Sequence, residues 1–62
     1  MQYMEKIGEK IKSLRFEKGM TLKDLSLKTG LSISFLSQIE RGSSSIAITS
    51  LKKIADSFNV AL

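Results

Sequence analysis

Several residue types that build catalytic sites or stabilise small proteins are absent from this sequence. There is no cysteine, so neither a disulfide nor a thiolate metal site can hold the chain together. There is no histidine either, which removes the commonest general base and metal ligand. With no catalytic motif and too short a chain to form a pocket, an enzyme is the weakest functional class. We expect no catalytic residues, no metal, no cofactor and no small-molecule ligand.

Long apolar runs are missing as well. The longest are far shorter than the roughly 20 residues that a membrane span requires. Charges at Glu5, Lys6, Glu9 and Lys10 interrupt any apolar core of a secretory signal. We therefore expect a cytoplasmic protein without a membrane partner. Its net charge of +4, from ten basic and six acidic residues, permits a polyanionic partner but does not require one.

Proline is absent and glycine is rare, and the places of the glycines predict where helices end. Gly19, Gly30 and Gly42 each follow an apolar pattern of helical spacing, and Asn59 follows a fourth. Helices commonly end at a residue with left-handed backbone, which Gly and Asn adopt most readily. The 62 residues thus predict one compact, all-α, four-helix domain over residues 1–62. We expect its helices over about 3–18, 22–29, 33–41 and 48–58.

Gly8 is the exception, because it lies inside the first predicted helix. A glycine there costs roughly 1 kcal/mol relative to alanine. We therefore expect another part of the chain to pack closely against this position.

The second and third predicted helices are joined only by Gly30-Leu31-Ser32. A turn of about three residues that contains glycine is what a helix-turn-helix motif requires. The two helices would touch near Ser26, which is small. Thr21, with Asp24 three residues later, and Ser32 are suitable N-caps for the two helices.

The outer face of the third helix is rich in hydroxyl groups. Ser34, Ser37, Gln38 and Arg41 recur with the spacing of one helical stripe. Serine is a mediocre helix former, so a helix that needed only solubility would carry Glu, Lys or Ala there. Taken alone, such a stripe is more often a solvated face than a binding surface.

Residues 7–62 closely resemble the lambda-repressor-like, or Cro/XRE, family of helix-turn-helix DNA-binding domains. The matching pieces are IGEKIKSLR, KGMTLKDLSLKTGLS, SFLSQIERG and TSLKKIADSFNV. The sequences of these pieces are most similar to those of regulators in which this domain precedes a cupin-type sensor domain. The family often has a fifth helix where this chain stops. We therefore expect either a module from a longer protein, with a truncated five-helix fold, or a natural short protein.

The resemblance implies roles for individual residues. The third helix would be the recognition helix in the major groove of DNA. The family's base-facing positions correspond to Ser32, Ile33, Ser34, Ser37 and Gln38. Its phosphate-contacting positions correspond to Thr21, Arg41, Ser43, Ser44 and Ser45. A mobile loop is an equally good interpretation of the three consecutive serines. Arg15 and Glu40 correspond to a structural ion pair that links the first helix to the recognition helix.

The family also implies a function. We expect sequence-specific binding of double-stranded DNA, as the DNA-binding module of a bacterial or phage transcriptional regulator. Such domains usually act as homodimers on palindromic operators, and the location would be nucleoid-associated. The alternative is a protein-interaction module, such as an antitoxin or a regulatory helical adaptor. Against this alternative, the recognition face carries Ser and Gln where a protein interface would favour aromatic residues and Met.

One departure from the family concerns the fourth helix. The family usually has Pro-Ser before it, which supplies an N-cap serine, whereas this chain has Ile46-Ala47. Alanine is a poor cap. We therefore expect Ser45 or Thr49 to cap the helix instead, or its first turn to fray.

Overall fold

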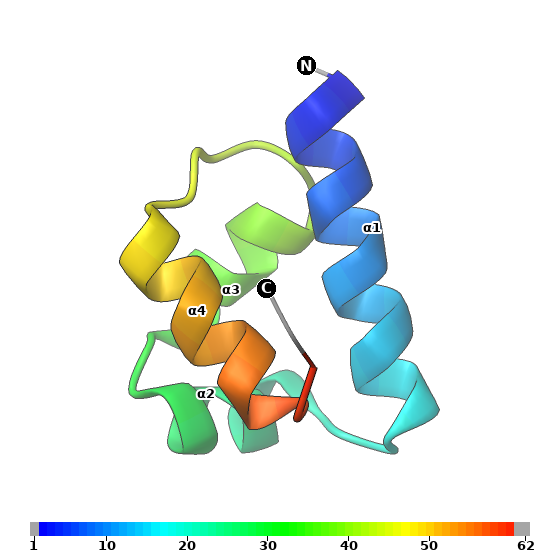
Figure 1. The fold of residues 1–62 in the computed structure, drawn as a ribbon, viewed down its shortest axis with the longest axis vertical. Coiled ribbons are helices and arrows are strands. Elements are labelled where there is room, and N and C mark those ends of the chain that lie inside the picture. The colour runs from blue at the N-terminus through cyan, green and yellow to red at the C-terminus, as the bar shows by residue number, and fades with distance from the viewer. Residues whose placement is uncertain (1, 61–62) are drawn as a thin grey trace.

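Four helices surround one apolar core in the computed structural model, which describes residues 2–60, with side chains from residue 5 onward (Figure 1). Residues 1, 61 and 62, and any fifth helix, lie outside the described residues. The helices are α1 (Gln2–Glu17), α2 (Leu22–Thr29), α3 (Ile33–Glu40) and α4 (Ile48–Ser57). Each boundary lies within one residue of the expected one, so the all-α prediction is confirmed. Within residues 2–60, none of the helices is both long and apolar enough to cross a membrane.

The helix ends follow the local signals in the sequence. Gly19, Gly30, Gly42 and Asn59 all have positive φ angles, between 59° and 75°. The amide of Gly30 donates to the carbonyl oxygen of Ser26 at 2.8 Å and closes α2. The predicted C-terminal caps are therefore confirmed.

The core is formed where α3 packs against both α1 and α2, while α2 also packs against α4. In Figure 1, α1 runs along one side of the molecule and the other three helices lie on the opposite side. Each helix contributes to the core, and Phe58 follows α4 into it. The buried core residues are Ile11, Leu25, Leu36, Ile39, Ile54 and Phe58.

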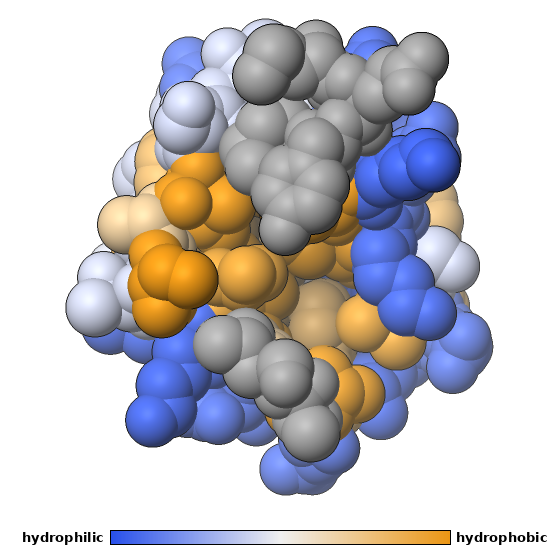
Figure 2. Space-filling model, turned by 45° about the horizontal axis from the view of Figure 1, so that its top comes forward, coloured by the Kyte–Doolittle hydropathy of each residue, from blue (hydrophilic) through white to orange (hydrophobic). Residues whose placement is uncertain are grey.

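Apolar side chains also reach the surface on one face of the molecule. Figure 2 shows them gathered on the face where α1 and α4 lie. Partly buried apolar residues that pack against the core include Ile7 and Leu14 of α1 and Leu51 of α4.

Gly8 lies where the backbone of α3 closely approaches α1. A Cβ atom added there would overlap the carbonyl oxygen of Ile39 and would lie 2.8 Å from that of Glu40. The expected close packing against Gly8 is thus confirmed, and the backbone of α3 is the neighbour.

The start of α4 differs from one of its two expected forms, whereas fraying of its first turn stays a prediction. Ala47 is the N-cap residue, and no side-chain hydrogen bond caps the helix, so the expected replacement by Ser45 or Thr49 is not seen. The helix still begins at Ile48. Its position is set by the burial of Ile54 and Ala55 rather than by a cap.

Replacing Ala47 by serine should supply the missing cap. Ala47 has φ −72° and ψ 151°, nearly the same as the capping residue Ser32, with φ −69° and ψ 151°. A serine can therefore accept a hydrogen bond from the first turn without a change in backbone. We expect a gain in unfolding free energy of about 1 kcal/mol, measured by thermal denaturation. Ser45→Ala is the control, with an unchanged melting temperature; an Ala47→Ser variant that melts at or below the parent would contradict the geometry.

Candidate nucleic-acid interface

The turn between α2 and α3 is fixed by polar contacts. The Ser26 hydroxyl donates to the carbonyl oxygen of Leu31 at 2.6 Å. The Leu31 amide donates to the Thr29 hydroxyl at 3.2 Å, and that hydroxyl donates to the carbonyl oxygen of Leu25 at 2.8 Å. The small residue expected at position 26 thus holds the turn directly. These bonds set the angle between the two helices.

The burial of α3 selects which of its side chains face outward. Leu36 and Ile39 are buried, so Ile33, Ser34 and Gln38 are exposed on the other side, and Ser37 is half-buried. The Ser32 hydroxyl accepts from the Phe35 amide at 3.1 Å and caps the helix. The five candidate base-reading residues therefore lie at the start and along the outer side of one short helix. Ser32, Ser34 and Gln38 are the exposed polar residues of this set.

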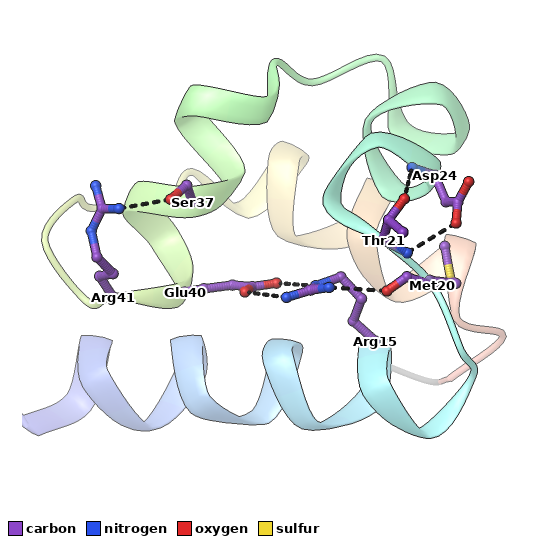
Figure 3. Close-up of polar contacts among 7 residues, drawn as sticks. All are labelled: Arg15, Met20, Thr21, Asp24, Ser37, Glu40 and Arg41. Carbon is purple, nitrogen blue, oxygen red and sulfur yellow. Dashed lines mark hydrogen bonds and ion pairs between the residues drawn. The ribbon is translucent and has the colours of Figure 1, made fainter.

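The start of α2 carries a complete capping box (Figure 3). The Asp24 amide donates to the Thr21 hydroxyl at 3.0 Å, and the Thr21 amide donates to Asp24 Oδ2 at 2.9 Å. The amide of Thr21 is thus already engaged. The amides of Leu22 and Lys23, which have no partner within the helix, are the donors that remain at this end.

Two hydrogen bonds with Thr21 lower the pKa of Asp24 below the ordinary 3.8. The larger effect comes from the Thr21 amide and the smaller one from the Thr21 side chain. A carboxyl group whose pKa is lowered by folding stabilises the fold at pH values above its ordinary pKa. This stabilisation is lost as the pH falls through the pKa of the folded state. Replacing Asp24 by alanine should therefore lower the melting temperature at pH 7. The difference from the parent should shrink below pH 3.8.

The control for Asp24 is Asp56→Ala. Asp56 is exposed in the last turn of α4, where the helix dipole disfavours a negative charge, so its removal should not lower the melting temperature. Thermal unfolding of the parent and both variants across the pH range measures this. An Asp24→Ala deficit that stays constant down to the lowest pH would contradict the capping account.

The loop after α3 is partly fastened to the helix. The amide and the hydroxyl of Ser43 both donate to the carbonyl oxygen of Gln38, at 3.0 and 3.1 Å. Gly42 packs closely against Glu5: a Cβ added to the glycine would lie only 2.8 Å from Glu5 Cγ. The hydroxyl of Ser44 makes only a 3.5 Å contact with the carbonyl oxygen of Ser45. Ser43 therefore closes α3, whereas the two following serines are more weakly held.

Arg15 is the most highly connected polar side chain near α3 (Figure 3). Its Nε and Nη2 atoms donate to the two oxygens of Glu40 at 2.7 and 3.0 Å, and Nη1 donates to the carbonyl oxygen of Met20 at 2.9 Å. The side chains of Arg15 and Glu40 are only 9% and 6% exposed. The hydrogen bond with Glu40 raises the pKa of Arg15 above its ordinary value. One guanidinium group thus ties α1 both to α3 and to the segment before α2.

Two partners of Arg15 were missed in the sequence. The carbonyl oxygen of Met20 is a backbone group, so no side-chain pattern could identify it. The ring of Phe16 lies 4.7 Å from the Arg15 guanidinium carbon while remaining 63% exposed. The aromatic residue that directly follows Arg15 in the sequence was the available signal, since guanidinium groups stack on aromatic rings.

The outer end of α3 carries one more polar contact. Arg41 Nη1 donates to the Ser37 hydroxyl oxygen at 2.7 Å, one helical turn away (Figure 3). No group of three or more metal-binding side chains occurs in the part of the chain that the structure describes. What the arrangement offers chemically is therefore a set of hydrogen-bonding groups on a rigidly held helix.

Comparison with known proteins places the chain in a family. Residues 11–62 match the family model HTH_3, Helix-turn-helix. The chain is 30% identical over 57 residues to the HTH-type transcriptional regulator DdrOP3 of Deinococcus deserti. The matched region covers 92% of this chain and 44% of the regulator. The chain therefore spans less than half the length of that relative.

The fold has a close counterpart among solved structures. The crystal structure of the restriction-modification controller protein C.AhdI from Aeromonas hydrophila matches with a TM-score of 0.95 and 24% sequence identity. The match covers 98% of this chain and 92% of the controller protein. It confirms the expected arrangement of the four helices. Because the family model covers most of the sequence, the chain belongs to the helix-turn-helix family HTH_3.

Proposed function

We propose that this protein binds double-stranded DNA sequence-specifically, as the DNA-binding module of a bacterial or phage transcriptional regulator. The observation that carries the proposal is the presentation of α3. Its apolar side is buried, its polar side is exposed, and its end is fixed through the pair of Arg15 and Glu40. The major groove of B-DNA admits a helix presented in this way. Membership of the family and the names of the relatives support the same function.

The outer side of α3 would read the bases. Gln38 has the amide geometry for a bidentate contact with N6 and N7 of adenine. Ile33 could pack against the methyl group of thymine, and its 46% exposure supports this role. Ser32, Ser34 and Ser37 are small enough to let the helix approach the base edges.

A second set of groups would hold the phosphate backbone. The start of α2 offers the amides of Leu22 and Lys23, next to Thr21, and a helix N-terminus favours an anion. The loop hydroxyls of Ser44 and Ser45 are more available than that of Ser43, which closes α3. Arg41, at the C-terminal end of α3 beside this loop, would add a positive charge. Such contacts position the helix without carrying sequence information.

Salt dependence distinguishes this function from a protein-interaction module. DNA binding through phosphates should weaken steeply between about 50 and 200 mM salt, with a logarithmic slope near −0.9 for each phosphate neutralised. Binding of a labelled random-sequence duplex, followed by fluorescence anisotropy, measures this slope. Absence of binding at low salt would instead favour a protein partner.

Gln38→Ala tests the groove assignment. On the preferred site it should cost about 1–3 kcal/mol and relax specificity at one base pair. The measurement compares affinities for that site and for its single-base-pair variants. Lys52→Ala, an exposed change on α4, is the control and should preserve the sequence preference. An equal loss on every sequence would make Gln38 a backbone contact.

Assembly and location are further parts of the proposal. A homodimer on a palindromic operator would place two copies of α3 about one helical turn of DNA apart. The protein would then act in the cytoplasm, associated with the nucleoid. Sedimentation of the protein with a selected duplex measures the number of chains bound, and one chain per operator would contradict the dimer. The sequence resemblance to regulators with a cupin-type sensor domain remains a proposal, which neither relative's name supports.

A further inference from the structure

The contact between Arg41 and Ser37 has a fixed direction. A guanidinium group has only donors, so the hydroxyl oxygen of Ser37 must accept the 2.7 Å hydrogen bond from Arg41 Nη1. The two residues are four apart and lie on the same side of α3, where side chains at this spacing meet. Ser37 is half-buried on the outer side of the helix, between the exposed Ser34 and Gln38 in its helical stripe.

The hydrogen of the Ser37 hydroxyl is left available. Ser26 and Ser57 donate theirs to the backbone carbonyl oxygens of Leu31 and Ile54, both at 2.6 Å, whereas the capping hydroxyl of Ser32, like that of Ser37, accepts a hydrogen bond. Among the residues whose side chains the structure describes, Ser37 donates to no acceptor. A hydroxyl has one donor and two lone pairs, and the cation already occupies one of these pairs. The positive charge also polarises the O–H bond and strengthens its donation.

We infer that Ser37 reads a hydrogen-bond acceptor on a base edge, and that Arg41 gives it this preference. The inference rests on the proposed DNA-binding function and adds to it. In the major groove the acceptors are N7 and O6 of guanine, N7 of adenine and O4 of thymine, whereas N4 of cytosine is a donor. A serine without a cationic neighbour can serve either kind of group. In addition to the phosphate contact proposed above, Arg41 acts on sequence specificity through Ser37 and is therefore a positioning residue.

This role differs measurably from a phosphate contact by Arg41. A phosphate contact contributes the same affinity on every sequence and adds about one unit to the salt dependence. A positioning role changes the preference at the base pair that Ser37 reads. The two can be separated by comparing single and double variants on one family of duplexes.

The experiment begins with selection of the preferred site from random duplexes by the parent protein. Affinities of the parent, Ser37→Ala, Arg41→Ala and the double variant are then measured on that site and on its single-base-pair variants. Both single variants should lose discrimination at the same base pair, by about threefold to tenfold. The double variant should lose no more discrimination at that base pair than either single variant does. For the parent, 7-deazapurine in place of a purine there, or 4-thiothymine in place of thymine, should weaken binding by a similar factor.

Three results would overturn the inference in distinguishable ways. If Arg41→Ala weakens binding equally on all sequences and leaves the preference at the Ser37 base pair intact, Arg41 contacts phosphate only. If neither 7-deazapurine nor 4-thiothymine at the base pair that Ser37 reads weakens binding of the parent, Ser37 does not donate to the base and the direction of the hydrogen bond is wrong. If the parent shows no sequence preference at any salt concentration, the proposed function itself fails. Arg41 is exposed, so its variant should melt with the parent, which separates specificity from folding.

Discussion

Replacing Arg15 by alanine is expected to lower the free energy of unfolding by about 3–5 kcal/mol, because it strands the carboxylate of Glu40 away from water. The Glu40 side chain is 6% exposed, and its two oxygens accept from Arg15 at 2.7 and 3.0 Å. The carbonyl oxygen of Met20 would lose its donor as well. A chain of this length typically has roughly 3–9 kcal/mol of stability in total. Urea denaturation should therefore show a midpoint far below that of the parent.

Two further variants identify the cause of this loss. Arg15→Lys keeps the charge but loses the planar fork, so its stability should fall between those of the parent and Arg15→Ala. Replacing Arg15 and Glu40 together by leucine removes the stranded charge and should recover much of the lost stability. If Arg15→Ala melts like the parent, the pair does not hold α3 in place.

Replacing Gly8 by alanine should also be strongly destabilising, although alanine favours a helix by about 1 kcal/mol relative to glycine. The added Cβ would overlap the carbonyl oxygen of Ile39 and press on that of Glu40. Both atoms belong to the backbone of α3, so no flexible side chain can move aside. We expect a net loss of about 3 kcal/mol, at the upper end of the cost of overpacking. Thermal denaturation followed by circular dichroism measures this loss.

Ser13→Ala provides the matched control on the same helix. Ser13 is exposed, so its replacement tests helix propensity without affecting the contact with α3. It should leave the melting temperature unchanged or slightly raised. A Gly8→Ala variant that also melts above the parent would show that α1 and α3 are not in close backbone contact.

Most of the fold could be predicted from the sequence because its signals are local. Helix ends follow from a few neighbouring residues, such as Gly30 after α2 and Ser32 before α3. The start of α4 was different, since Ala47 gives no capping signal and the helix is positioned by burial of its apolar side. The close approach at Gly8 was predictable as a fact, but the sequence could not say which segment approaches it.

The details of the candidate site depended more on contacts between distant or flexible groups. The spacing of Ser37 and Arg41 permitted their contact, but an exposed arginine has many side-chain conformations, so spacing alone could not select this one. The sequence did not show that Ser43 donates back to the carbonyl oxygen of Gln38, and its contact with phosphate stays a prediction. The neighbouring Gly42 packs against Glu5, which is far away in sequence.

The central claim is that the exposed side of α3 meets DNA, and an NMR titration of the isotope-labelled protein with a short mixed-sequence duplex at low salt tests it most directly. This measurement detects weak binding and needs no known operator. We expect amide shifts to cluster at the start of α2, along α3 from Ser32 to Gln38, and in residues 41–45, and to fade as salt is raised. Unshifted amides in α3, or shifts scattered over the lysines of α1 and α4, would contradict the account.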